Sequence, residues 1–204
     1  MVGIDVGISH FCTDTDGLHV ANPKYYRKAQ AELRCKQRKV ARRKKGSHRR
    51  KKAVTELARA HRKVKRMRLD FLHKTVNHYI EKYQTICIEA LKVKNALVVG
   101  DSRTNEDRTA MVKNRHLSKS IADSGWSTFF ELLSYKAAEA RREVIKVNPR
   151  NTSQNCSGCG RKVSKSLATR MHNCPDCNLS LDRDINAARN IAAIGAGQAL
   201  QALT

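Results

Sequence analysis

Short apolar runs separated by turn residues occupy the first 21 positions of the chain. Residues 1–8 (MVGIDVGI) have the continuous apolar character of a buried strand. The pair Asp16–Gly17 is a typical hairpin turn, and it lies between two further short runs, FCTDT and LHVAN. We therefore expect an antiparallel arrangement of up to three strands. Because few proteins place a core strand at residue 1 with no lead-in, we also expect a further segment upstream.

Residues 24–81 have a different pattern. They contain no proline, and apolar residues recur at roughly helical spacing from Leu33 to Ile80. Gly46 and Ser47 interrupt the run, and Ser47 is a candidate N-cap of a second helix. The pattern predicts two antiparallel helices joined by a short turn.

The rest of the chain alternates strands and helices. A mixed polar stretch over 94–118 predicts a loop with a short helix. The other predicted elements are a strand over 85–91, a helix over 126–142, a strand over 143–148 that Pro149 stops, and an alanine-rich helix over about 184–194. This order of strands and helices predicts a mixed α/β fold.

Composition changes this picture through the charge. The 204 residues and the apolar fraction of 40% are enough for one domain with a modest core and a small appendage. Lys and Arg total 41 against 18 acidic residues, which gives a net charge of +23. So large an excess repels itself in a compact fold, and nucleic acid is therefore the expected partner. A membrane surface is the weaker alternative, because the sequence has no long apolar span.

The positive charge is concentrated in residues 24–68, which hold 21 Lys or Arg and two Glu. A shorter run of this kind is usually a solvated helix face, but so long and one-signed a run favours contact with phosphates. Such contact is independent of the base sequence. The candidate nucleic-acid-binding residues are Arg34, Lys36, Arg38, Lys39, Arg42, Arg43, Lys44, Lys45, Arg49, Arg50, Lys51, Lys52, Arg62, Lys63, Lys65 and Arg66.

Three acids are candidates for a metal centre. Asp5 lies inside the first apolar strand, Glu89 lies near the end of a second one, and Asp184 begins the last predicted helix. A carboxylate buried in an apolar strand is costly unless a cation or a donor compensates its charge. Oxygen ligands suit Mg²⁺ or Mn²⁺, and a pair of such ions can hydrolyse a phosphodiester. A lone acid at a strand end is more often a turn or cap residue, and Asp182 is a candidate cap of the last helix.

Four of the seven cysteines form two C-x-x-C pairs, Cys156 with Cys159 and Cys174 with Cys177, separated by 14 residues. Four thiolates complete a tetrahedral Zn²⁺ site, which is structural when the protein fills every position. The first residues are not a secretory signal, so we expect a reducing, cytoplasmic compartment, in which such pairs favour zinc. Redox C-x-x-C motifs are the alternative, and His172 is a weaker candidate ligand. The cysteines expected to be buried or incidental are Cys12, Cys35 and Cys87.

Five segments occur in one order along the chain: GIDVGI, CIEAL, NCSGCG, HNCPDC and DRDINAARNI. This series resembles the TnpB (OrfB) proteins of insertion sequences and their relatives, the compact type V CRISPR effectors. The resemblance covers nearly the whole chain. It implies a RuvC nuclease of the RNase H-like α/β fold that cleaves DNA with Mg²⁺ or Mn²⁺. The catalytic acids of the family then fall on Asp5, Glu89 and Asp184, with Asp182 as the runner-up for the third position.

The resemblance also implies a division of the chain into three segments. Residues 1–150 would form the nuclease core, with 24–81 as a basic helical hairpin insertion. Residues 151–180 would form an inserted zinc ribbon that helps to handle nucleic acid near the nuclease site. Residues 181–204 would carry the third acid and the C-terminal helix.

The chain differs from the family pattern at three points. It would correspond to the C-terminal half alone, without the half that recognises guide RNA and the short target-adjacent DNA motif. Ala90 stands where the family often has Asp, and Asn178 stands where Gly usually ends the second knuckle. Because Asn tolerates the left-handed conformation, the knuckle is expected to form.

The sequence therefore predicts a transposon-associated, divalent-metal-dependent DNA endonuclease in a prokaryotic cytoplasm, near the nucleoid. DNA is the expected partner, with guide RNA in the full-length family, and the oligomeric state stays open. The alternative is a catalytically inactive remnant that binds nucleic acid. A zinc-ribbon RNA-binding factor of translation type is a third class, and it leaves Asp5 and Glu89 unexplained.

Overall fold

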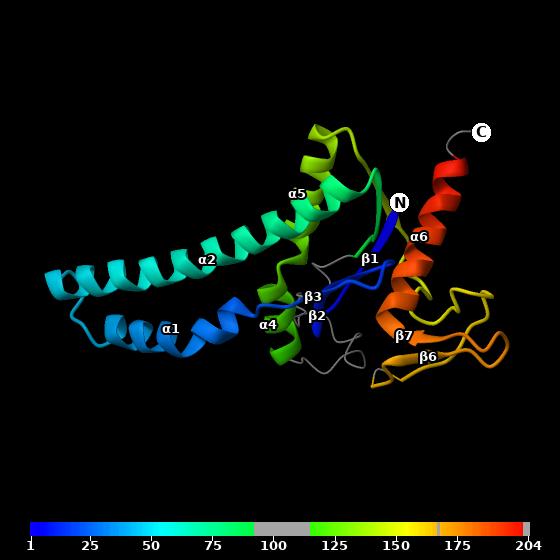
Figure 1. Cartoon of the computed structure of the whole chain (residues 1–204). Coiled ribbons are helices and arrows are strands. Elements are labelled where there is room, and N and C mark those ends of the chain that lie inside the picture. Colours follow the sequence, from blue (N-terminus) through cyan, green and yellow to red (C-terminus); the bar gives the residue numbers. More distant parts are fainter. Residues whose placement is uncertain (92–114, 167, 202–204) are drawn as a thin grey trace, which may run out of the picture.

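A five-stranded mixed sheet forms the centre of the computed structural model (Figure 1). The structure describes residues 1–91, 115–166 and 168–201. The strands are β1 (Val2–Val6), β2 (His10–Asp14), β3 (His19–Ala21), β4 (Thr85–Glu89) and β5 (Glu143–Val147). They lie in the order β3-β2-β1-β4-β5, in which β1, β2 and β3 are antiparallel neighbours and β4 is parallel to β1 and β5. The prediction of a mixed α/β fold is confirmed.

The β2–β3 hairpin turns where the sequence predicts it. Asp14 Oδ1 accepts hydrogen bonds from the backbone N–H groups of Asp16 and Leu18, both at 3.0 Å. Gly17 follows with a φ of 88°, a conformation that glycine adopts without the steric cost of a side chain.

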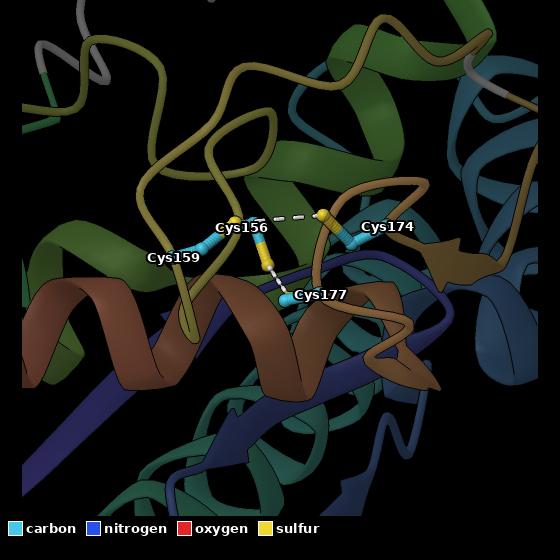
Figure 2. A group of neighbouring side chains, drawn as sticks. All are labelled: Cys156, Cys159, Cys174 and Cys177. Carbon is cyan, nitrogen blue, oxygen red and sulfur yellow. Dashed lines mark hydrogen bonds between the residues drawn. The ribbon is translucent and has the colours of Figure 1, made fainter.

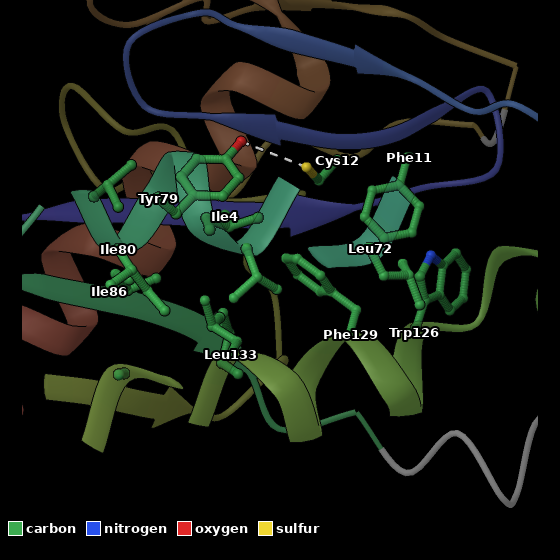
Figure 3. Close-up of a cluster of buried hydrophobic side chains, with 14 of the residues drawn as sticks. Ile4, Phe11, Cys12, Leu72, Tyr79, Ile80, Ile86, Trp126, Phe129 and Leu133 are labelled. Atoms are coloured by element: carbon green, nitrogen blue, oxygen red, sulfur yellow. Dashed lines mark hydrogen bonds between the residues drawn. The ribbon is translucent and has the colours of Figure 1, made fainter. Parts of the chain in front are cut away.

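Helices α2 (His48–Lys82) and α5 (Trp126–Glu139) bury the main hydrophobic core against one face of the sheet (Figure 3). Phe11 of β2 packs edge-on against the rings of Phe71 and Phe129, at centroid distances of 5.0 and 5.1 Å. The buried residues of this core are Val2, Ile4, Phe11, Cys12, Leu72, Val76, Tyr79, Ile80, Ile86, Ile88, Ile121, Trp126, Phe129, Leu133 and Ala137.

Helix α6 (Arg183–Gln201) covers the opposite face and packs directly on β1. A Cβ atom added at Gly3 would lie 2.1 Å from the carbonyl oxygen of Ala188 and 2.6 Å from the backbone nitrogen of Ala192. One added at Gly195 of α6 would lie 2.2 Å from Sγ of Cys87. These two glycines therefore set how closely the helix approaches the sheet.

Helices α1 (Tyr25–Ala41) and α2 form the predicted antiparallel hairpin, which extends away from the sheet (Figure 1). Ser47 caps α2 as predicted, because its side chain accepts a hydrogen bond from the N–H of Arg50 at 3.2 Å. The guanidinium of Arg50 in turn donates to the carbonyls of Val40 and Arg43 at the end of α1, at 3.2 and 3.4 Å. Arg50 therefore holds the two helices together at the turn.

Asp123 of α4 (Arg115–Ser124) attaches the hairpin to the rest of the fold. Its two carboxylate oxygens accept hydrogen bonds from the N–H groups of Tyr26 and Arg27 in the first turn of α1. Oδ1 also accepts from Nη2 of Arg68 in α2 at 2.8 Å. A carboxylate from a distant helix thus takes the place of the N-cap side chain that α1 lacks.

The predicted element bounds differ from the structure at several ends. Helix α5 stops at Glu139 instead of 142, because Arg141 adopts a φ of 54° and the N–H of Arg142 turns back to the Ala137 carbonyl. Helix α6 continues to Gln201 instead of ending near 194. Strand β4 ends at Glu89 and strand β5 at Val147, each before the predicted end.

The rest of the described chain adds one small sheet to the fold. Strands β6 (Met171–Asn173) and β7 (Ser180–Asp182) form a two-stranded antiparallel sheet that the sequence pattern does not predict. Most of the loop predicted over 94–118 lies outside the described residues. No helix in the described part of the chain has the length and apolar character needed to cross a bilayer.

Gly3→Ala is expected to lower the free energy of unfolding by about 2–3 kcal/mol, because its Cβ would meet the backbone of α6. Gly197→Ala is the matched control, since a Cβ there meets nothing within 4 Å and alanine favours a helix by up to about 1 kcal/mol. Urea unfolding followed by circular dichroism measures both variants. Wild-type stability of Gly3→Ala would contradict the close packing of α6 on β1.

Candidate functional site

Asp5 and Glu89 lie at the carboxyl ends of two neighbouring parallel strands. The register pairs Ile4 of β1 with Ile88 of β4, so the next residues, Asp5 and Glu89, come side by side. Neighbouring strands in a sheet are about 4.8 Å apart. The sheet therefore brings together two acids that are 84 positions apart in the sequence.

Both side chains point to the face that α6 covers. Gly3 and Cys87, two residues before Asp5 and Glu89, face α6, and residues two apart on a strand point to the same face. Asp184 lies in the first turn of α6. Three elements thus bring the three predicted acids to one end of the sheet.

Asp182 has a different role from Asp184. Its Oδ1 accepts hydrogen bonds from the N–H groups of Asp184 at 2.7 Å and Ile185 at 3.3 Å, so Asp182 caps the start of α6. Asp184 is partly buried, and its Oδ1 lies 3.4 Å from Nε of Arg183. This difference favours Asp184 as the third acid.

Two of the three acids, Asp5 and Glu89, have perturbed ionisation. Burial raises the pKa of Asp5 well above its usual value, and the negative charges of Glu89 and Asp184 raise it further, while Arg183 opposes them. Burial also raises the pKa of Glu89, and a hydrogen bond from Thr152 partly offsets this effect. Full ionisation of the group therefore needs a compensating cation.

The acids are spaced more widely than the cysteines. Among the described residues, only Cys156, Cys159, Cys174 and Cys177 form a group whose ligand atoms all lie within 4.8 Å of one another. Oxygens that share two ions about 4 Å apart, each at about 2.1 Å, can lie up to about 8 Å from one another. The acids need not meet as closely as the cysteines to hold two ions.

Thr152 also belongs to this site, although no sequence pattern singles it out. Its hydroxyl donates to Oε1 of Glu89 at 2.5 Å, and its side chain is buried. A single threonine in a polar loop follows no spacing pattern that would mark it as a site residue. The one sequence feature that could have indicated it is its position four residues before Cys156, between the predicted strand and the first cysteine knuckle.

The four predicted zinc cysteines converge in the loops beside α6 (Figure 2). The sulfurs of Cys156 and Cys177 are 3.5 Å apart, and those of Cys159 and Cys174 are 3.6 Å apart. A tetrahedral zinc with Zn–S bonds of about 2.3 Å needs sulfurs about 3.8 Å apart. Asn178 adopts a φ of 57°, so the knuckle forms with Asn in the left-handed conformation, as predicted.

Hydrogen bonds shift the thiols of this cluster in opposite directions. The backbone N–H of Cys177 lowers the pKa of the Cys174 thiol to about 6. Hydrogen bonds to neighbouring cysteines raise the pKa of Cys177 to about 12, so the convergence of the four sulfurs is what supports a metal site. His172 is buried against Lys165 and is not part of the cluster. The other cysteines match the prediction, since Cys12 and Cys87 are buried and Cys35 is exposed on α1.

The predicted nucleic-acid-binding residues all lie on α1, on α2 or in the turn between them, and most are exposed. Three of the sixteen have partners within the chain: Lys36 pairs with Glu32, Lys39 pairs with Glu56, and Arg50 binds backbone carbonyls. Arg50 is therefore engaged in holding the hairpin together. The others present a strongly positive surface to the solvent.

Comparison with known proteins identifies the family to which this chain is similar. Residues 1–99 match the OrfB_IS605 family, described as a probable transposase, and residues 126–191 match the Cas12f1-like TNB domain. A Streptomyces pristinaespiralis protein, whose name gives RNA-guided DNA endonuclease as its inferred activity, is 38% identical over 198 residues. InsQ of Escherichia coli, which has the same inferred activity in its name, is 31% identical over 196 residues. The TnpB-like protein L79 of Acanthamoeba polyphaga mimivirus is 31% identical over 149 residues.

The chain belongs to the TnpB (OrfB) family. It spans about half the length of the curated relatives that it matches: the Streptomyces match covers 95% of this chain and 45% of the relative, and the InsQ match covers 96% and 49%. The mimivirus match covers 73% and 27%.

Solved structures show that this TnpB-family chain shares its fold with Cas12f. A Cas12f1–sgRNA–target DNA complex aligns with a TM-score of 0.59 at 18% identity, over 94% of this chain and 49% of that chain. A CRISPR–Cas12f ternary complex aligns with a TM-score of 0.58 at 20% identity, over 94% and 38%. The mixed sheet and its flanking helices are therefore common to both.

Without divalent cations, the TnpB-family chain is expected to lose stability relative to Asp5→Asn as the pH rises from about 4 to about 7. The raised pKa values of Asp5 and Glu89 mean that the folded state binds more protons than the unfolded chain in this range, so stability present at low pH is lost as these groups ionise. Thermal melting across this range measures the difference, and added Mg²⁺ should reduce it. Asp70→Asn on α2 is the exposed control and should follow the wild type. Parallel curves for Asp5→Asn and the wild type would contradict the buried repulsion.

The purified chain is expected to contain one zinc ion, and Cys156→Ser is expected to lose it together with thermal stability, because the remaining three thiolates hold zinc less tightly. Atomic emission measures the zinc content of each variant. Cys35→Ser removes an exposed thiol outside the cluster and should keep the metal. Equal zinc content in the two variants would contradict the four-cysteine site.

Proposed function

We propose that this chain is a divalent-metal-dependent DNA endonuclease of the RuvC type. The observation that carries the proposal is the meeting of Asp5, Glu89 and Asp184 at one end of the sheet on the face covered by α6. The strand order β3-β2-β1-β4-β5 supports the RNase H-like fold that the family resemblance implies. The endonuclease names of the relatives support the same chemistry.

The acids have distinct places in this proposal. The charges of both Glu89 and Asp184 raise the pKa of Asp5, so Asp5 is the central acid of the three. Asp5, Glu89 and Asp184 would together hold the cations. Two Mg²⁺ or Mn²⁺ ions, when bound, would activate water and stabilise the leaving oxygen of a phosphodiester. The residues fit such a pair, because divalent cations compensate the negative charge of buried carboxylates that would otherwise repel one another.

The basic hairpin would bind the nucleic-acid backbone. Binding to its exposed Lys and Arg side chains would be independent of the base sequence, because these side chains contact phosphates and not base edges. The hairpin extends from the sheet that carries the acids (Figure 1). Nucleic acid bound along the hairpin would be held on the same molecule that carries the acids.

The zinc site would be structural. Four cysteines fill every position of a tetrahedral ion, which leaves none for a substrate. We assign residues 151–180 to a zinc ribbon, residues 1–150 to the nuclease core with the insertion at 24–81, and residues 181–204 to its last segment. The ribbon would then brace the loop that leads to α6.

RNA-guided, site-specific cleavage is proposed for the longer proteins of the family, in which DNA and a guide RNA are the partners. The names of the relatives and the Cas12f complex with sgRNA and target DNA support both partners. A chain that spans about half of these relatives would supply the nuclease part, and DNA binding would place it at the nucleoid.

The test is cleavage of single-stranded DNA with and without Mg²⁺ or Mn²⁺. We expect metal-dependent nicking that Asp184→Asn reduces below detection, because one ligand of the ions loses its charge. Asp182→Asn is the matched control, since Asn caps a helix as well as Asp, and it should cut as the wild type does. Loss of cleavage in Asp182→Asn with wild-type cleavage in Asp184→Asn would instead identify Asp182 as the third acid.

The alternative function predicts a different result in the same samples. A catalytically inactive remnant would bind DNA with an affinity whose logarithm falls linearly with the logarithm of the salt concentration, and would give no product at any metal concentration. Binding without cleavage by the wild type would therefore reject the nuclease proposal.

A further inference from the structure

The segment between Pro149 and Ser157 connects the acid centre with the first zinc knuckle. It follows β5 and contains Thr152, whose side chain is 3% exposed. Thr152 contacts Glu89 through its hydroxyl and α6 through its carbonyl oxygen, which accepts a hydrogen bond from Asn190 at 2.8 Å. One residue therefore joins β4 and α6, the elements that carry Glu89 and Asp184.

The hydroxyl of Thr152 has one proton and two possible acceptors. It lies 2.5 Å from Oε1 of Glu89 and 3.1 Å from the carbonyl oxygen of Pro149. A charged acceptor at the shorter distance forms the stronger hydrogen bond. With Glu89 ionised, the proton therefore lies towards Oε1 and restricts the rotation of the carboxylate.

Two asparagines one helical turn apart on α6 hold the rest of the segment. Nδ2 of Asn190 also donates to the carbonyl of Asn155 at 2.7 Å. Nδ2 of Asn186 donates to the same carbonyl at 2.8 Å, and Oδ1 of Asn186 accepts from the N–H of Ser157 at 2.9 Å. Asn186 is fully buried, so these bonds are protected from water. Cys156, a predicted zinc ligand, lies between the two clamped residues.

We propose that Thr152 is a positioning residue for Glu89, and that the first zinc knuckle holds Thr152 in place. Zinc fixes Cys156, the asparagines fix the segment against α6, and Thr152 then presents its hydroxyl to Glu89. Removal of zinc therefore weakens cation binding at a centre to which zinc contributes no ligand. This inference rests on the proposed function, because it takes Glu89 as a ligand of Mg²⁺ or Mn²⁺.

The experiment measures Mn²⁺ binding by electron paramagnetic resonance, without substrate. Thr152→Val keeps the shape of the side chain and removes the hydroxyl, and it is expected to weaken Mn²⁺ binding by about 10-fold or more, as changes to outer-shell partners do. Thr152→Ser keeps the hydroxyl and should stay within about threefold of the wild type. Thr75→Val makes the same change at a buried threonine of α2, whose hydroxyl bonds the Phe71 carbonyl, and should have no effect.

The outcomes separate this inference from the proposed function. Wild-type Mn²⁺ affinity in Thr152→Val overturns the role of Thr152, while loss of Mn²⁺ binding in Asp184→Asn would still support the acid centre. No Mn²⁺ binding by the wild type overturns both. Unchanged zinc content in Thr152→Val shows that its effect does not come from an unfolded knuckle.

The part played by zinc is tested by a double-mutant cycle. Cys156→Ser should weaken Mn²⁺ binding about as much as Thr152→Val, and the double variant should show little further loss, because both changes break one linkage. Asn190→Ala, which releases the Thr152 carbonyl and leaves the cysteines intact, should also weaken binding if Cys156→Ser does not fold. Additive losses, or wild-type affinity in a folded Cys156→Ser, overturn the link to the knuckle; if Cys156→Ser does not fold, wild-type affinity in Asn190→Ala overturns it.

Discussion

The burial of Asp5 beside two other carboxylates is the constraint on which this structure depends. Asp5, Glu89 and Asp184 meet because β1 and β4 are parallel neighbours and because α6 packs on β1 without an intervening side chain at Gly3. The large core on the other face of the sheet keeps the strands in register. The fold therefore offsets a local cost with stability gained elsewhere, as functional sites commonly require.

Local signals in the sequence were sufficient for much of the fold. Asp16–Gly17 marks a hairpin, Ser47 marks the start of α2, and alternating strands and helices indicate a layered α/β arrangement. Asp5 and Glu89 are detectable because each is an acid within or at the end of an apolar strand. The four cysteines are detectable by spacing alone. In each of these cases the decisive interaction lies within a few residues or follows a fixed period.

The features that could not be predicted depend on distant contacts. Asp123 caps a helix that begins almost a hundred positions earlier, and Thr152 meets Glu89 across 63 positions. Arg50 belongs by composition to the basic surface, yet it binds carbonyls of the neighbouring helix. Strands β6 and β7 have three residues each, too few for a period to appear. Contacts between residues so far apart in the sequence cannot be inferred from the residue types alone.

The length of the hairpin sets a geometric limit. The basic part of α2, residues 48–68, spans about 31 Å at 1.5 Å per residue. A double helix rises about 3.4 Å per base pair, so a duplex bound along this stretch would extend over about nine base pairs, slightly less than one full turn. A straight helix of that length would contact one side of a duplex. Base pairs beyond this stretch, and the other side of the duplex, would need contacts from surfaces outside the hairpin.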